Sequence, residues 1–265
     1  MGNILVRIVV LSPSQCTELY LRHAAYRLIH RFLNPVLPDS RLSTFFRWKS
    51  ALTLVGTEFH GENLRKNRAK LERLCDPKMA LQPELARLLP NDSNALYKVL
   101  DVGAGPISKV GKITDGRPID LIPVDPLADD YQQLLAKNDL QPPVPTRKGY
   151  GERLSEQFPE NSFDLIHARN SVDHCLDPVV VILNCVRVLK PGCHFYLNHY
   201  RNEGIAADYY GLHQWNFDLL DGQFVVSDRF GKVISISSEL EGMAHVTSVE
   251  SQGDRIIVVI QKSGS

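Results

Sequence analysis

The sequence has few cysteines, and no two of them stand at short spacing. The odd count and the irregular spacing argue against a disulfide framework and against a zinc site of the CxxC type. We therefore expect reduced, buried thiols in a cytoplasmic protein, and the sequence predicts no metal site. The cysteines are Cys16, Cys75, Cys175, Cys185 and Cys193.

The chain also lacks an excess of charge of either sign. Its 265 residues include 30 Lys and Arg and 30 Asp and Glu, which gives a formal net charge of zero. A neutral balance does not favour nucleic acid or an anionic membrane surface as a partner. Residues 1–11 are apolar but too short to span a bilayer, and they lack the marks of a signal peptide. We expect no nucleic-acid partner and no membrane insertion, and residues 1–11 should form a short strand or packed arm.

The first third of the chain carries helical patterns. Ser12, Pro13 and Gln15 are typical of a helix start with a capping box, and apolar residues follow at helical spacing as far as residue 32. Residues 62–74 predict a basic amphipathic helix with a solvated charged face. Polar residues at 90–93 mark a boundary. We predict an N-terminal helical region, residues 1–92, that acts as a lid or binds an acceptor, followed by one domain, residues 93–265.

Strand and helix patterns alternate after this boundary, which favours a parallel sheet covered on both faces. Apolar stretches predict strands at 97–102, 119–124, 163–168 and 194–199, with a weaker strand at 146–148. Helices are predicted at about 108–113, 131–137 and 177–190. The last of these starts at Asp177 and ends at Lys190-Pro191-Gly192. Residues 200–240 form an insertion with a hairpin at 223–237, and a second hairpin spans 245–261.

A glycine-rich turn follows the first of these strands, with the letters VLDVGAGP at 99–106. Glycine lets backbone N–H groups approach a ligand closely because no Cβ stands in the way. Asp125 follows the next strand, close to the offset of about 20 residues expected for an acid that holds ribose hydroxyls. Alone, each feature fits either a nucleotide site or an ordinary turn.

Four pieces in order give the chain a family resemblance. They are VLDVGAGP at 99–106, VDP at 124–126, GERL with FPENSFDLIHARNSVDH at 151–174, and RVLKPG at 187–192. With these pieces the chain resembles the class I S-adenosylmethionine-dependent methyltransferases, in particular their small-molecule branch. The resemblance implies an α/β fold: a Rossmann-like, seven-stranded, mostly parallel sheet with helices on both faces, to which this chain adds the N-terminal helical region and the inserted hairpin.

The resemblance also implies a cofactor, S-adenosylmethionine, and residues that hold it. The glycine loop would pass the methionine part, and Asp101 would hold the loop or the cofactor's amino group. Asp125 would accept hydrogen bonds from both ribose hydroxyls. The remaining residues would lie along the adenine or close the site beside the sulfonium. The implied cofactor-binding set is Asp101, Gly103, Ala104, Gly105, Asp125, Pro126, Gly151, Glu152, Arg169 and Asn170.

Three positions depart from the family pattern. Ile107 stands where a third glycine is frequent, Tyr150 stands where an acid often meets the adenine amine, and Cys193 stands where a second glycine often follows KPG. The first change tightens the loop, the second removes an expected adenine contact, and the third is a small packing residue.

Methyl transfer to oxygen or nitrogen can require a base, which has to lie at the carboxyl ends of the strands. His174 follows the strand at 163–168 and is the first candidate for a catalytic residue. His199 ends the strand at 194–199 and is the second, with Asp173 and His213 as weaker candidates. Each of these histidines could instead serve as a structural hydrogen-bonding group.

The sequence thus predicts methyl transfer to a small-molecule acceptor, such as a sugar, a lipid precursor or a secondary metabolite. Three alternatives remain open at this point: a non-catalytic partner subunit with the same fold, an RNA or protein methyltransferase, and an NAD-dependent oxidoreductase. The sequence predicts neither the acceptor nor the oligomeric state.

Overall fold

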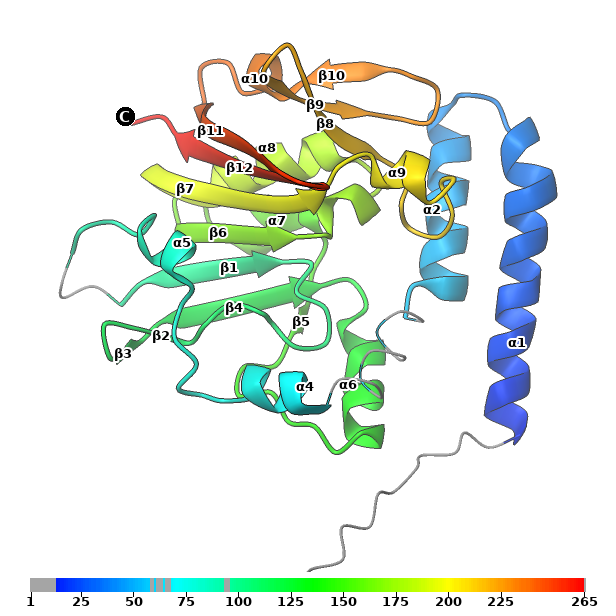
Figure 1. Cartoon of the computed structure of the whole chain (residues 1–265), viewed down its shortest axis with the longest axis horizontal. Helices are drawn as coiled ribbons and strands as arrows, with labels where there is room; N and C mark the ends of the chain where they lie inside the picture. The colour runs from blue at the N-terminus through cyan, green and yellow to red at the C-terminus, as the bar shows by residue number, and fades with distance from the viewer. Residues whose placement is uncertain (1–12, 58–59, 61–63, 65–67, 93–95, 265) are drawn as a thin grey trace, which may run out of the picture.

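The computed structural model describes residues 13–57, 60, 64, 68–92 and 96–264. Its centre is a seven-stranded sheet with the order β11-β12-β7-β6-β1-β4-β5, shown in Figure 1. Neighbours from β5 to β7 pair in parallel, and β12 is antiparallel to both β7 and β11. The predicted Rossmann-like sheet is therefore confirmed. Its strands are β1 (Lys98–Val102), β4 (Asp120–Asp125), β5 (Arg147–Lys148), β6 (Phe163–Arg169), β7 (Leu189–Tyr200), β11 (Ala244–Gln252) and β12 (Arg255–Lys262).

Successive side chains of the central strands point to opposite faces of the sheet. Because consecutive residues are buried, both faces are covered. Leu100, Ile122 and Ile166 pack in one apolar cluster with α8 (Pro178–Val188). Val99, Leu121 and Leu165 pack in a second cluster with Leu81 and Leu85, of which Leu85 lies in α5 (Pro83–Ala86). The sheet is thus the middle layer of the molecule. Further short elements are α6 (Ala128–Lys137), η3 (Gly151–Arg153), α7 (Leu154–Gln157) and η4 (Val172–His174).

The N-terminal helices stand side by side at the edge of the sheet where the parallel strands end (Figure 1). The first, α1 (Pro13–Leu28), continues into η1 (Ile29–Leu33) and η2 (Asn34–Val36). Ser40 caps the second, α2 (Arg41–Val55), through its hydroxyl, which accepts from the Ser43 N–H. Trp48 and Leu52 of α2 pack against residues that begin α6. Leu21, Leu28 and Phe32 of the predicted apolar repeat are exposed, 60–63% of their surface remaining accessible.

Some predictions for this region lie outside the described residues. These are the arm at 1–11, the Ser12 cap and most of the first turns of the helix predicted at 62–74. The described part of that helix is α4 (Arg68–Leu74), whose Leu71 and Leu74 are buried. The predicted boundary at 92–93 also adjoins residues that are not described. The division into two regions therefore remains a prediction.

The insertion forms a second, three-stranded sheet in the order β10-β9-β8. The hairpin expected at 223–237 corresponds to β9 (Gln223–Ser227) and β10 (Val233–Ser235), followed by α10 (Ile236–Glu239). No strand was predicted for the segment that forms β8 (Asn216–Leu220), which pairs with β9. Buried Phe217 and Phe224 join the main cluster of the domain. A short helix, α9 (Glu203–Ala206), precedes this sheet.

The helix predicted at 108–113 is wrong. That segment runs beside residues 79–81 instead: the Lys112 N–H donates to the Met79 carbonyl, and the Leu81 N–H donates to the Ile113 carbonyl. A Cβ at Gly111 would lie 2.2 Å from the carbonyl oxygen of Ala80, so glycine permits this close approach. The segment ends in the small hairpin of β2 (Ile113–Thr114) and β3 (Arg117–Pro118).

The predicted end of the helix at residues 190–192 also needs correction. The helix α8 ends at Val188, and Lys190-Pro191-Gly192 already belongs to β7, in which Leu189 pairs with Phe163. The Lys190 ammonium donates to the Asp164 carboxylate at 2.7 Å instead of lying at the helix end. The predicted start of this helix is confirmed, because the Asp177 carboxylate accepts from the N–H groups of Val179 and Val180.

Candidate functional site

The glycine loop leaves the carboxyl end of β1 in a left-handed conformation. Gly103 has φ +67° and Gly105 has φ +68°, values that glycine adopts without strain. The N–H groups of Gly103 and Ala104 donate to the Val124 carbonyl at 2.9 and 3.1 Å, which fastens the loop to the neighbouring strand. A Cβ at Gly103 would lie 2.2 Å from the Ser171 Cβ, so the loop also touches the segment that follows β6.

Asp101 is buried near the end of β1, and its carboxylate is bonded to a residue on the far side of the glycine loop. Its carboxylate accepts a hydrogen bond from the Ser108 hydroxyl at 2.6 Å and lies 2.7 Å from His167 Nδ1. Ser108 follows the glycine loop, so this contact ties the far side of the loop back to the strand. The two roles that the resemblance implied for Asp101, holding the loop or the cofactor's amino group, remain predictions.

Asp125 ends β4, adjacent to the glycine loop. Its Oδ2 accepts from the Gly105 N–H at 3.0 Å, and its Oδ1 accepts from the Leu127 N–H at 2.9 Å. Burial raises the pKa of this carboxyl to about 6, against the two backbone hydrogen bonds, which lower it. Pro126 follows directly and is half-buried. The acid and the glycine loop therefore form one connected unit, as a nucleotide site requires.

The buried carboxyl of Asp125 should make stability depend on pH. Its pKa rises from 3.8 to about 6, so the folded state binds this proton more tightly than the unfolded chain does. The free energy of unfolding without cofactor should therefore fall by roughly 3 kcal/mol between about pH 4 and pH 6, and this group adds little change above. Urea denaturation of the wild type and of Asp125→Asn across this range measures the effect. Equal pH dependence in the two proteins would contradict the assignment.

His60 was missed by the sequence analysis. Its ring lies against the glycine loop, because a Cβ at Gly105 would be 3.0 Å from His60 Cε1. The ring also meets Tyr131 of α6 edge to face at 5.1 Å, and burial lowers the pKa of the imidazole to about 4. A neutral ring from the N-terminal region therefore covers the loop. The sequence around His60 carries no motif that could have revealed this.

Gly151 and Glu152 both contact the start of α8. A Cβ at Gly151 would lie 2.8 Å from Val181, so the backbone packs closely on that helix. Glu152 Oε1 accepts from the N–H groups of Leu176 and Asp177 at 2.7 and 3.4 Å. These contacts position α8, and the role of both residues toward an adenine remains a prediction.

Arg169 and Asn170 lie at the carboxyl end of β6. Arg169 is exposed, while Asn170 adopts φ +47° and accepts a hydrogen bond from the Arg255 guanidinium at 3.0 Å. Ser171 follows and donates its hydroxyl proton to the Val102 carbonyl at 2.8 Å. The predicted residues at the ends of β1, β4 and β6 are therefore brought to one edge of the sheet.

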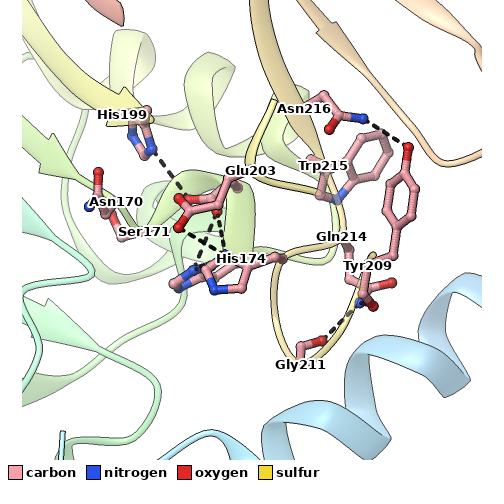
Figure 2. A network of polar contacts seen from close by, with 12 residues as sticks. Asn170, Ser171, His174, His199, Glu203, Tyr209, Gly211, Gln214, Trp215 and Asn216 are labelled. Carbon is pink, nitrogen blue, oxygen red and sulfur yellow. Dashed lines mark hydrogen bonds and ion pairs between the residues drawn. The ribbon is translucent and has the colours of Figure 1, made fainter. Parts of the chain in front are cut away.

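A cluster of histidines and acids lies immediately beyond Ser171. We call Asp173, His174, His199, Glu203 and His213 the histidine cluster, and Figure 2 shows His174, His199 and Glu203 converging on one point. Asp173 Oδ2 lies 3.2 Å from His213 Nδ1 and 3.3 Å from His174 Nε2. The two histidine nitrogens are 3.1 Å apart. His199 Nδ1 is 3.3 Å from Asp173 Oδ1, and Glu203 Oε1 is 3.7 Å from His213 Nδ1.

Within the cluster, the two predicted catalytic histidines differ in how much of their side chains is exposed. The His174 side chain retains 29% of its exposed surface, whereas that of His199 retains 1%. His174 can therefore meet a bound molecule, while His199 contacts Asp173 from the protein interior. Burial lowers the pKa of His174 to about 4 and also lowers the pKa of His199. Burial likewise lowers the pKa of His213, but Asp173 and Glu203 outweigh it and leave the pKa above its usual value.

Two tryptophans fix the backbone that carries this cluster. Trp48 Nε1 of α2 donates to the His174 carbonyl at 3.0 Å, and Trp215 Nε1 of the insertion donates to the Cys175 carbonyl at 3.1 Å. Tyr26 of α1 in turn donates its hydroxyl proton to the Gly211 carbonyl at 3.2 Å. The N-terminal helices and the insertion therefore join directly at the cluster.

The site fits a nucleotide cofactor of the predicted kind. Two left-handed glycines, an acid bound to one of them and a further strand end lie at one edge of the sheet. Open sheets of this type bind nucleotides at the carboxyl ends of their strands. Asp125 and the glycine loop would hold the cofactor there.

Comparison with known proteins agrees with this geometry. Residues 100–197 match a family model described as a methyltransferase domain. An uncharacterized methyltransferase of Schizosaccharomyces pombe, C1B3.06c, is 30% identical over 106 residues, which are 36% of this chain and 37% of that protein. The chain thus matches little more than a third of the length of this relative.

Solved structures share the fold at low sequence identity. The crystal structure of the trans-methyltransferase CalH in complex with SAH superposes with a TM-score of 0.50 at 12% identity, covering 94% of this chain and 74% of that one. The putative methyltransferase in complex with the Trm112 activator of Haloferax volcanii has a TM-score of 0.46 at 15% identity, covering 85% and 99%. Residues 100–197 are therefore similar to a methyltransferase domain of the kind that uses S-adenosylmethionine as the methyl donor, and the fold of the chain agrees with this similarity.

Proposed function

We propose that this protein transfers the methyl group of S-adenosylmethionine to a small-molecule acceptor. The contact between Gly103 and Ser171 supports this most directly, because it joins the cofactor loop to the segment that carries the histidine cluster. Ser171 is only two residues from Asp173 and three from His174. A methyl donor on the glycine loop and an acceptor at the cluster would therefore be neighbours.

The protein's part in methyl transfer is mainly to position the acceptor and exclude water, because the positive sulfonium is already an activated leaving group. The exposed edge of His174 is where an acceptor would be deprotonated. His199 would act as a positioning residue through Asp173, because its side chain is buried. The N-terminal helices and the insertion would enclose the acceptor, since both contact the residues at 174–175.

The balanced charge of the chain favours a small acceptor over a nucleic acid. Among the described residues, no helix combines the length and apolar character needed to cross a membrane. As part of the same proposal, we place the protein in the cytoplasm, because its cysteines are expected to be reduced thiols.

Cofactor binding is the first test of this proposal. We expect S-adenosylmethionine and S-adenosylhomocysteine to stabilise the protein in thermal unfolding, by about 2.7 kcal/mol at 100 times the dissociation constant, and NAD to have no effect. Titration calorimetry with the same ligands checks the result. Absence of binding by both sulfur nucleotides would contradict the proposal. Binding without turnover on any acceptor would favour the partner-subunit alternative.

A further inference from the structure

Three atoms of the histidine cluster form a small triangle. Asp173 Oδ2, His174 Nε2 and His213 Nδ1 are separated by 3.1, 3.2 and 3.3 Å. They come from two segments, the turn after β6 and the insertion, and the indoles of Trp48 and Trp215 both donate to backbone carbonyls of that turn. The triangle is thus a consequence of tertiary structure, built from groups that all bind metal ions well.

No arrangement of protons satisfies all three contacts. If both histidine nitrogens carry a proton, each can donate to the carboxylate, but the two nitrogens then face each other as donors. If only one carries a proton, the other nitrogen presents a lone pair to the carboxylate oxygen. A cation between the three atoms would accept a lone pair from each of them at once.

The surroundings of the triangle contain further unsatisfied polar atoms. Asp173 Oδ1 and His199 Nδ1 lie 3.3 Å apart and have no hydrogen-bond partner other than each other among the described residues, and His199 Nε2 is buried without any such partner there. Glu203 Oε2 is also buried without such a partner. Asp173 keeps only 3% of its side-chain surface exposed and His199 only 1%. Buried polar groups are normally satisfied, so these atoms favour the binding of a ligand at this place.

We propose that Asp173, His174 and His213 bind a divalent transition-metal ion of the zinc type, with Glu203 beside it. Ligand atoms about 2.0–2.1 Å from a tetrahedral ion lie roughly 3.3–3.4 Å apart, close to the separations found here. Two imidazole nitrogens favour zinc or a similar ion over magnesium, which prefers oxygen ligands. His174 and His213 keep 29% and 30% of their side-chain surface exposed, which leaves access for a further ligand.

The role of this ion rests on the proposed function. An acceptor hydroxyl bound at the open position would lose its proton to solvent more readily, because the cation stabilises the oxyanion. The oxygen would then form a bond to the methyl carbon while the carbon–sulfur bond breaks and leaves its electron pair on sulfur. The products are the methylated acceptor and S-adenosylhomocysteine. The ion would thus perform the step that the sequence assigned to His174 as a base.

The sequence predicted no metal site, and this proposal departs from that prediction. The spacing of the ligands explains the difference. Asp173 and His174 are adjacent, but His213 follows 39 residues after His174 and belongs to the insertion. No short motif spans such a distance, so only the folded chain brings the three side chains together.

The direct test is titration of the metal-free protein with Zn²⁺ by calorimetry, with Mg²⁺ as a comparison. We expect one tight zinc equivalent in the wild type, and at least tenfold weaker binding in His174→Ala and His213→Ala. The control is His245→Ala, because this histidine is exposed on β11. Thermal unfolding of each variant checks that it is folded, and His213→Gln replaces the alanine variant if that one is not.

Titration with Co²⁺ gives a second readout, since imidazole and carboxylate ligands in a tetrahedral arrangement produce visible absorption bands. We expect these bands in the wild type and in His245→Ala, and their loss in His213→Ala. The proposal is overturned if the wild type binds no zinc, or if the cluster variants bind it as tightly as the wild type. S-adenosylhomocysteine is titrated into the same samples, so a failure of the proposed function is seen separately from a failure to bind metal.

Discussion

Replacing Asp125 by alanine is expected to weaken the binding of S-adenosylhomocysteine by about 100-fold or more. Hydrogen bonds to a charged group contribute roughly 1.5–3 kcal/mol each, and the carboxylate would supply two of them to the ribose, where 1.4 kcal/mol corresponds to tenfold in affinity. The variant also removes the acceptor for the Gly105 N–H, which would loosen the glycine loop. Titration calorimetry on folded protein gives the affinity.

Asp120→Ala provides the control for this experiment. Asp120 is exposed at the opposite end of the same strand, β4, so the variant removes an acid of the same type away from the glycine loop. Its affinity for S-adenosylhomocysteine should equal that of the wild type. An unchanged affinity in Asp125→Ala would mean that the cofactor does not lie against β4, and the assignment of the site would fail.

Replacing Gly103 by alanine should have the second large effect, on stability as well as on binding. Gly103 has φ +67°, a conformation that costs other residues about 1–2 kcal/mol. The new methyl group would also lie 2.2 Å from the Ser171 Cβ, and overpacking of this kind costs roughly 1–3 kcal/mol more. We expect the free energy of unfolding to fall by about 3 kcal/mol and cofactor binding to be lost.

The variant Gly116→Ala separates the cost of the backbone conformation from the cost of overpacking. Gly116 has a similar φ of +73°, but nothing lies within 4 Å of the position of a Cβ. This variant should therefore lose only about 1–2 kcal/mol, the cost of the backbone conformation, and should bind cofactor normally. Urea denaturation of the three proteins measures the difference. Equal losses in the two variants would show that Ser171 does not press against the glycine loop in solution.

The fold of the domain was predictable because its signals are local. A buried strand followed by a glycine loop, and a helix that starts at Asp177 and Pro178, are patterns that a few adjacent residues determine. The closing hairpin was predicted for the same reason, and β11 and β12 pair as far as Gln252 and Arg255, on either side of its turn.

The errors occurred where a distant contact overrides the local pattern. Residues 108–113 have a sequence compatible with a helix, but hydrogen bonds to Met79 and Leu81 hold them beside residues 79–81 instead. Lys190-Pro191-Gly192 looks like a helix end, yet pairing of Leu189 with Phe163 draws the preceding residue into the sheet. The strand β8 was missed because its polar residues have partners elsewhere in the insertion, as the Asp218 carboxylate does in the Asn202 amide at 2.6 Å.

The candidate site likewise contains residues that could be predicted from local sequence and residues that could not. Asp125 and the glycines could be predicted because each follows a strand, and the carboxyl ends of parallel strands meet at one edge. His60 and His213 reach the site from the N-terminal region and the insertion, and their positions depend on tertiary packing alone. The sequence therefore indicated Asp173, His174, His199 and His213 as separate candidates, whereas the structure places them with Glu203 in one group of five.

The fluorescence of the two tryptophans can report on the candidate site. The chain has only Trp48 and Trp215, and both indole N–H groups bind the adjacent carbonyls of His174 and Cys175. The tryptophan fluorescence of the protein therefore originates beside the residues at which a methyl acceptor would bind. A shift of this peptide would change the emission of both indoles, and Trp48→Phe would leave the signal of the insertion alone. Occupancy of the site can thus be followed in real time without any attached label.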